Sequence, residues 1–265
     1  MSHCYKWYRL TTYLSHLDTH NSTSTTKSQP IHLNLVSVSL IMSSLPEPIL
    51  YHIKPTKLVP NSPKPLLLHK KAFVKDGQVD RTAAFNTFRS NNWDVQWLVR
   101  YGQHQRAHYH SQTHEAMIVV HGPGKIRWGV ADLSENWEDH TYGQAYEDGG
   151  IEVDVEVGDL FVIPAGVSHK SYDPDAKSAS FGCLTGDARK IDNNIEVSEV
   201  PLEGFCMMGA YPQGFSWTWD EGGDSKGGFE AVWGVENADA DPYTGKDGGI
   251  SKYWKSQANE FRSSL

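Results

Sequence analysis

The sequence has little cysteine and no long apolar run. Its three cysteines, Cys4, Cys183 and Cys206, include no pair with the Cys-x-x-Cys spacing of a metal site. Three cysteines, a small and odd number, do not predict a disulfide framework and favour a reduced, intracellular protein. Cys206 lies in the apolar run 205–208, so we expect it in the core. No stretch approaches the roughly 18 consecutive apolar residues of a membrane span, so no membrane partner is expected.

Positive charge is also scarce. The net charge is −8, and lysine and arginine form no cluster. Because nucleic-acid binding needs such clusters for phosphate contacts, we expect no nucleic-acid partner. A Gly-rich phosphate loop and a Ser-His-Asp arrangement are missing too. Lys170 and Arg127 are candidates for holding an anionic substrate group, but we interpret each as solvated surface charge.

Residues 1–45 differ from the rest in composition. They are rich in Ser and Thr and carry three basic residues against one acidic residue, Asp18, a net charge of +2 that leaves −10 on the remainder. Three interpretations compete: a disordered tail, a mitochondrial transit peptide, or a translation start at Met42. We favour disorder with Met42 as the true start, and hence a cytoplasmic protein. A transit peptide would place the protein in mitochondria instead.

Residues 46–260 predict a single domain that begins with a Pro-rich stretch. Residues 46–65, together with the apolar 66–68, suggest extended edge segments. Asp80 is suited to cap a helix that runs to about Asn91, the only substantial helix expected. Its buried face would carry Ala84, Phe85 and Phe88.

Short strands separated by Gly and Pro turns dominate the middle of the chain. Residues 151–157 alternate apolar and acidic side chains, as in a half-buried strand with one wet face. The acidic stretch 134–150 is interpreted as an inserted loop. The pattern predicts an all-β sandwich or barrel, and one barrel because no internal repeat is present. The expected strands are 93–101, 116–121, 125–130, 151–157 and 160–163.

Two glycine-framed blocks, 102–122 and 158–173, carry the candidate site. His108 and His110 are two positions apart, so on an extended chain their imidazoles project to one face. Glu115 begins the next predicted strand, where an antiparallel neighbour would bring its carboxylate beside the histidine pair. His169 follows the Pro-x-Gly turn 164–166 and would complete the site. A lone His-x-His is a weak signal, whereas the two blocks in this order are specific.

Three imidazoles and one carboxylate suit a first-row metal such as Fe, Mn, Ni, Cu, Co or Zn. An octahedral ion would keep about two positions open for water, substrate or dioxygen. We therefore predict one divalent transition metal, with no further catalytic residue identified. The predicted ligands are His108, His110, Glu115 and His169.

Several residues near the blocks have a plainer interpretation. His114 precedes Glu115 and should point away from the site, while His104 and His121 are expected in a loop and far along the strand. Trp217 and Trp219 alternate as on a strand and are expected to pack in the barrel. Four apolar residues are expected to be core that also lines the pocket. Met117 and Val119 share the parity of Glu115, and Phe161 and Ile163 are candidates for the opposite wall.

The blocks match both cupin motifs at every fixed position from Gly102 to His169; the Asn that usually closes the second motif is Asp173 here. The chain from about 49 to 254 resembles the YjlB-like cupins, with insertions near 134–150 and 184–200. This resemblance implies a single RmlC-like jelly-roll barrel with one short N-terminal helix and one metal at the four named positions. The resembling pieces are 108–111, 113–115, 164–167 with 169–170, 209–212, and 241–243 with Trp254.

Some similar cupins accompany pathways that make oxidised aromatic polyketides. We therefore expect a metal-dependent oxidoreductase, dioxygenase-like, acting on a small organic molecule that is aromatic or polyketide-derived. The alternatives are a metal-dependent isomerase or lyase, in which the metal polarises a carbonyl, and a non-catalytic small-molecule-binding cupin. Because such barrels expose sheet edges that need covering, we also expect a homodimer.

Overall fold

The computed structural model describes residues 46–179, 181–186 and 190–254. The expectations for residues 1–45, including Cys4 and a start at Met42, lie outside the described residues. The single domain expected over 46–260 stays a prediction.

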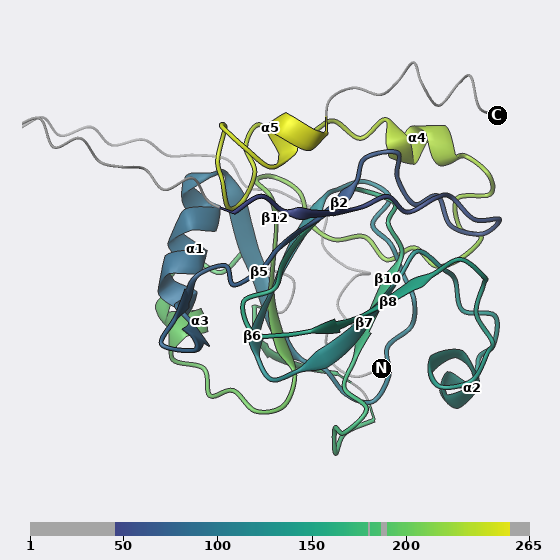
Figure 1. Cartoon of the computed structure of the whole chain (residues 1–265), viewed down its shortest axis with the longest axis horizontal. Helices are drawn as coiled ribbons and strands as arrows, with labels where there is room; N and C mark the ends of the chain where they lie inside the picture. The colour runs from purple at the N-terminus through teal and green to yellow at the C-terminus, as the bar shows by residue number, and fades with distance from the viewer. Residues whose placement is uncertain (1–45, 180, 187–189, 255–265) are drawn as a thin grey trace, which may run out of the picture. The chain divides into compact units, whose positions relative to one another are not determined.

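Two antiparallel sheets form the framework (Figure 1). Their facing sides enclose an inner apolar core that draws residues from both sheets, among them Met117 and Phe161 from one and Trp128 from the other. The larger sheet has the order β1 (Ile49–Tyr51), β2 (Leu66–His69), β9 (Leu160–Ile163), β6 (Glu115–His121), β12 (Cys206–Pro212), β5 (Trp93–Arg100) and β11 (Gly182–Thr185). The smaller sheet has the order β10 (His169–Tyr172), β7 (Gly124–Trp128) and β8 (Ile151–Val155).

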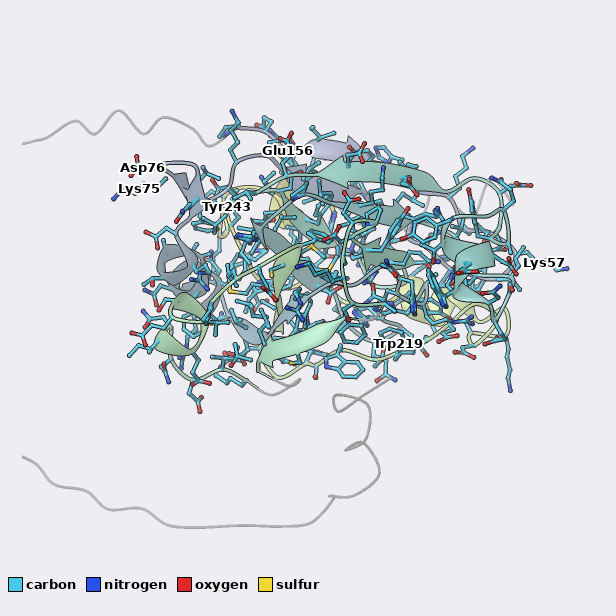
Figure 2. All side chains as sticks on the ribbon, turned by 90° about the horizontal axis from the view of Figure 1, so that it is seen from below. Lys57, Lys75, Asp76, Glu156, Trp219 and Tyr243 are labelled. Atoms are coloured by element: carbon cyan, nitrogen blue, oxygen red, sulfur yellow. The ribbon has the colours of Figure 1, made fainter. Side chains whose placement is uncertain are left out.

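This mainly-β architecture of two antiparallel sheets confirms the predicted fold class, an all-β jelly roll. In the described part of the chain, no strand of the larger sheet is paired with a strand of the smaller one, so the two sheets do not close into a continuous barrel. A separate hairpin of β3 (Val74–Lys75) and β4 (Gln78–Val79) lies outside both sheets. Figure 2 shows Glu156, from the turn after β8, and Trp219 on opposite sides of the molecule.

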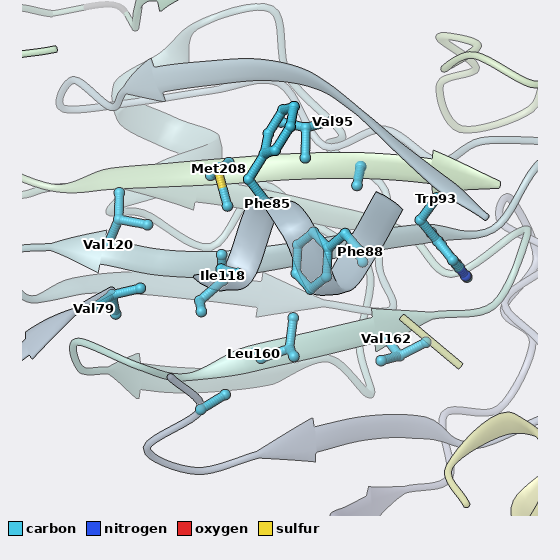
Figure 3. Close-up of a cluster of buried hydrophobic side chains, with 14 of the residues drawn as sticks. Val79, Phe85, Phe88, Trp93, Val95, Ile118, Val120, Leu160, Val162 and Met208 are labelled. Carbon is cyan, nitrogen blue, oxygen red and sulfur yellow. The ribbon is translucent and has the colours of Figure 1, made fainter. Parts of the chain in front are cut away.

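Strict alternation along β6 gives the larger sheet two apolar faces. Met117 and Val119 face the inner core, whereas Ile118 and Val120 face an outer core. Phe85 and Phe88 of helix α1 (Arg81–Ser90) pack into this outer core (Figure 3). Because both faces are covered, the middle of the larger sheet is buried and holds its inward side chains in fixed positions.

Helix α1 forms where the sequence predicted it. The Asp80 carboxylate accepts a hydrogen bond from the Ala83 amide at 2.9 Å, which satisfies one of the free amides of the first turn. Asn92, just past the helix, has a φ of 62°, so the chain leaves the helical region there. Four short helices were not predicted: α2 (Trp137–Thr141), α3 (Ile195–Ser198), α4 (Phe229–Trp233) and α5 (Ile250–Tyr253). None of the described helices is long and apolar enough to cross a membrane.

Three sequence-based expectations about strands are wrong. β2 lies between β1 and β9, so only β1 of the Pro-rich region is an edge strand. Phe161 and Ile163 lie on the same wall as Met117, not on the opposite one, because β9 pairs directly with β6 and sets Phe161 opposite Met117. Trp217 and Trp219 lie outside any strand. The alternating strand predicted at 151–157 is present as β8, which ends two residues earlier at Val155 and alternates partly buried with exposed side chains over its first four residues.

Candidate metal centre

The four predicted ligands come together at one end of the inner core. His108 and His110 lie on an extended segment before β6, and His108 forms an isolated bridge with His169, the first residue of β10. In this bridge the backbone amide of each residue donates to the carbonyl of the other, at 3.0 and 2.8 Å. Glu115 is the first residue of β6. Two segments that are 61 residues apart in the sequence are thus joined by backbone hydrogen bonds at the site itself.

The side chains converge as well. One ring nitrogen from each of His108, His110 and His169 lies within 4.8 Å of the other two. The Oε2 atom of Glu115 lies 3.3 Å from Nε2 of His110 and 3.3 Å from Nε2 of His169, so the carboxylate touches two of the three imidazoles. All four side chains are buried, with 2–5% of their surface exposed.

The backbone fixes which nitrogen of each ring faces the centre. The Nδ1 atom of all three histidines lies against a backbone carbonyl, and a carbonyl oxygen only accepts hydrogen bonds. Each Nδ1 therefore carries a proton, so in the neutral ring the free lone pair is on Nε2. This is how metal-binding histidines are held in proteins. The acceptors are the carbonyls of Arg106 at 3.1 Å, Thr218, and Val167 at 3.1 Å, for His108, His110 and His169 respectively.

The centre contains polar atoms with no hydrogen-bond partner. Both His110 Nε2 and Glu115 Oε2 are buried and unpartnered. A nitrogen lone pair and a carboxylate oxygen are both acceptors, so they do not satisfy each other. Unsatisfied buried polar atoms are costly, and a cation among these acceptors would satisfy them all. The residues present therefore fit a divalent metal ion.

The electrostatics of the site keep the carboxylate charged. Burial raises the pKa of Glu115, but the imidazoles of His110 and His169 outweigh burial and hold it below its usual value. Burial lowers the pKa of His110, and the Glu115 carboxylate more than reverses this. Burial, together with the neighbouring His169 and His110, holds the pKa of His108 well below its usual value. His108 is therefore neutral at pH 7, the state in which an imidazole binds a metal.

Two aromatic residues at the site were missed by the sequence reasoning. Tyr211 donates a hydrogen bond from its hydroxyl to Oε1 of Glu115. Trp219 stacks on the His108 imidazole with ring centroids 3.7 Å apart and an angle of 7° between the rings. The only sequence signal for Tyr211 was its place in the resembling piece 209–212. Trp219 was interpreted as barrel packing, but it packs against the predicted ligand itself.

The other histidines behave as the plainer interpretation predicted. His114 is buried, and its ring bonds only to backbone: Nδ1 accepts from the Ala165 amide and Nε2 donates to the Glu236 carbonyl, each at 2.9 Å. His104 stacks on Trp137, and His121 is exposed.

The interpretation of Lys170 and Arg127 as solvated surface charge is wrong. Only 1% of Lys170 and 7% of Arg127 is exposed. The reason is the inserted stretch 134–150, whose helix α2 supplies backbone carbonyls to both side chains. The Lys170 ammonium also pairs with Asp132 at 2.6 Å, and the Arg127 guanidinium pairs with Glu152 at 2.8 Å.

Comparison with known proteins gives one clear relative. No family model matches the chain. The uncharacterized protein YjlB of Bacillus subtilis (strain 168) is 26% identical over 202 residues, which cover 74% of this chain and 90% of YjlB. This similarity confirms the predicted resemblance to the YjlB-like proteins.

More distant likenesses exist among solved structures. The Bacillus subtilis oxalate decarboxylase with Mn(II) centres is 8% identical, with a TM-score of 0.25 over 64% of this chain but only 30% of the decarboxylase. The dTDP-4-dehydrorhamnose 3,5-epimerase of Elizabethkingia anophelis NUHP1 is 12% identical, with a TM-score of 0.27 over 64% of this chain and 76% of the epimerase. At these TM-scores, the likenesses carry no argument about what this chain does.

Proposed function

We propose that the chain is a metal-dependent oxidoreductase, dioxygenase-like, that acts on a small aromatic or polyketide-derived molecule. One observation carries the proposal: three imidazoles, each held at Nδ1 by a backbone carbonyl, bring one ring nitrogen each within 4.8 Å of the others, and the unpartnered Oε2 of Glu115 lies 3.3 Å from Nε2 of His110 and of His169. His108, His110, His169 and Glu115 would hold one divalent transition metal. Bound there, a redox-active ion would supply open positions for substrate oxygen and dioxygen.

The residues of the chain have three tasks in this proposal. The three histidines would bind through Nε2, because their Nδ1 atoms donate to backbone carbonyls. Glu115 would contribute one negative charge, and a divalent ion held there would supply the remaining positive charge to an anionic substrate oxygen. The burial of all four side chains excludes bulk water from the centre and strengthens these electrostatic interactions.

The apolar wall beside Glu115 supports a substrate with an apolar body. Four residues form this part of the wall, and none is more than 2% exposed. We propose that they line the pocket, where flat apolar or aromatic groups would contact them. They are Met117 and Val119 on β6, and Phe161 and Ile163 on β9.

The first test is elemental analysis of the anaerobically purified protein beside the variants His108→Ala and Glu115→Ala. We expect about one redox-active metal per chain in the wild type and a large loss in both variants. His121→Ala is the matched control, because His121 is an exposed histidine outside the site. No metal after anaerobic reconstitution with Fe, Mn, Ni, Cu or Zn would overturn the proposed site.

The second test addresses the reaction. Oxygen consumption is measured with a panel of aromatic and 1,3-dicarbonyl compounds. The metal-loaded wild type is compared with Glu115→Ala, which is expected to lose the metal. Consumption that needs both a substrate and the intact site supports the oxidoreductase. Tight zinc occupancy without any oxygen consumption would count against it.

A further inference from the structure

We propose that Tyr211 is the positioning residue of the metal centre: it binds one oxygen of Glu115 and leaves the other as the single carboxylate atom that faces the imidazoles. This inference rests on the metal site proposed above. It adds how the carboxylate is held and how many of its oxygens are available to the ion.

The direction of the hydrogen bonds is fixed by chemistry. The indole Nε1 of Trp97 lies 2.9 Å from the Tyr211 hydroxyl oxygen, and an indole nitrogen only donates. The Tyr211 hydroxyl therefore accepts from Trp97, and its one proton is left for Oε1 of Glu115, which as a carboxylate only accepts. The relay runs one way, from Trp97 through Tyr211 to Glu115.

The sheet register builds this relay. Ala210 on β12 pairs with Ala116 on β6, so Tyr211 and Glu115 occupy the next position along each strand. On the other side, Gly209 of β12 pairs with Trp97 of β5. A Cβ atom at Gly209 would lie 2.0 Å from Cζ2 of Trp97, so only glycine leaves room for the indole to cross β12 and reach Tyr211.

Trp97 is partly buried, and the Tyr211–Glu115 end of the relay is buried. Tyr211 is 1% exposed and Glu115 is 2% exposed. Because Oε1 is taken by a hydroxyl and Oε2 has no hydrogen-bond partner, the two carboxylate oxygens are not equivalent. Rotating the carboxylate to offer both oxygens to an ion would break the bond to Tyr211 and leave a buried hydroxyl proton unpaired. We infer that Glu115 contributes one oxygen, which keeps a further metal position free for substrate.

The test is the binding of Co²⁺, whose visible absorption spectrum reports the number of ligands. Apo wild type and Tyr211→Phe are titrated with Co²⁺, followed by absorption and calorimetry. Changing a residue that orients a metal ligand typically weakens metal binding about 10–100-fold, so we expect Tyr211→Phe to bind Co²⁺ at least about tenfold more weakly. We also expect an altered visible spectrum, because the released carboxylate is free to offer both oxygens.

The matched control is Tyr172→Phe. The Tyr172 hydroxyl also donates to a carboxylate, Oε2 of Glu152 at 2.6 Å, but Glu152 is not a proposed ligand. This variant should keep the wild-type Co²⁺ affinity and spectrum. A spectral change in Tyr211→Phe alone therefore separates positioning of the ligand from a general loss of packing.

The outcomes separate the two proposals. Wild type that binds no Co²⁺ overturns the metal site and this inference with it. Wild type that binds Co²⁺, beside Tyr211→Phe with unchanged affinity and spectrum, overturns the positioning role alone. Should Tyr211→Phe fail to fold, Trp97→Phe decides instead: it frees the Tyr211 hydroxyl to turn away, so a weaker change in the same direction is expected. An unchanged Trp97→Phe spectrum would then overturn the role.

Discussion

His169 and Lys170 are neighbours on β10, yet they enter two buried polar clusters of opposite character. His169 points into the inner core and joins His108, His110 and Glu115. Lys170 points to the other side of the smaller sheet, toward the inserted stretch with α2, where it meets Asp132 and His140.

The outer cluster contains its own cation. Three acceptors surround the Lys170 ammonium: Asp132 Oδ1 at 2.6 Å, His140 Nδ1 at 2.7 Å and the His140 carbonyl at 3.0 Å. Lys170 therefore supplies the positive charge that faces Asp132. The inner cluster has no lysine or arginine among its four side chains, and His110 Nε2 and Glu115 Oε2 lie buried in it without a hydrogen-bond partner. Burial alone therefore does not mark a ligand site; a buried carboxylate without a lysine or arginine beside it does.

The largest effect is expected from breaking the outer cluster. Asp132→Asn leaves the buried Lys170 ammonium without its counter-charge, which typically costs about 3–5 kcal/mol of unfolding free energy. Chemical denaturation at pH 7 measures this. The metal content of the folded fraction should stay at the wild-type level, because the cluster faces away from the imidazoles.

The control for this variant is Asp132→Asn combined with Lys170→Met. Removing both charges should recover most of the lost stability, because an apolar side chain replaces the unpaired charge. A double variant as unstable as Asp132→Asn alone would contradict the assignment of this cluster as a closed ion pair.

A change in the inner cluster should lower metal affinity more than it lowers folding stability. Glu115→Gln keeps the shape of the side chain but removes the charge that attracts a cation. We expect metal affinity to fall at least about 100-fold, or about 2.7 kcal/mol, while the unfolding free energy of the apo protein changes by less than this. Co²⁺ titration and denaturation of the same preparation check both parts. A large loss of apo stability with unchanged Co²⁺ affinity would reverse the comparison.

The two clusters also differ in how far the sequence predicted them. Local rules place the four predicted ligands, His108, His110, Glu115 and His169, and so made them predictable: two-residue alternation on an extended chain, a strand start, and a Pro-x-Gly turn. The Asp80 cap predicted α1 for the same reason. Lys170 and Arg127 were misjudged because their burial depends on where the stretch 134–150 folds back, and no local pattern encodes that.

Long-range register explains the remaining misses. Tyr211 reaches Glu115 across 96 positions of sequence, through a strand pairing that periodicity does not specify. Phe161 and Ile163 were correctly expected to face the inner core but were assigned to the wall opposite Met117. The order of strands in a sheet cannot be predicted from any single strand. The sequence thus predicted the proposed ligands but not the residues that hold them in place.

A smaller effect should appear on acidification of the outer cluster. Burial, with Lys170 and Arg106 adding to it and Asp132 opposing it, lowers the pKa of His140 to about 4. The unfolded chain takes up this proton near pH 6.5, before the folded chain does, so stability is lost as the pH falls from about 6.5 to 4. This group would contribute a loss of about 2 kcal/mol between pH 7 and pH 4.5.

The variant His140→Gln isolates this contribution from that of other titrating groups. Its unfolding free energy should fall less between pH 7 and pH 4.5 than that of the wild type. His121→Gln, which alters an exposed histidine, should follow the wild-type curve. Identical pH curves for wild type and His140→Gln would show that His140 does not stay neutral in the folded state.

The smallest effect is expected from removing the stacking contact between Trp219 and His108. Trp219 stacks on His108, and an aromatic pair of this kind contributes about 0.5–1.5 kcal/mol beyond its buried area. Trp219→Leu keeps an apolar side chain but removes the stack, so the His108 ring gains freedom and Co²⁺ affinity should fall about threefold to tenfold. Trp217→Leu is the control, because Trp217 meets Trp219 edge-on at 6.5 Å. If both variants weaken Co²⁺ binding equally, the contribution comes from general coverage of the site. If only Trp219→Leu weakens it, the stacking contact itself orients His108. The inner cluster then depends on ring geometry, whereas the outer cluster depends on charge.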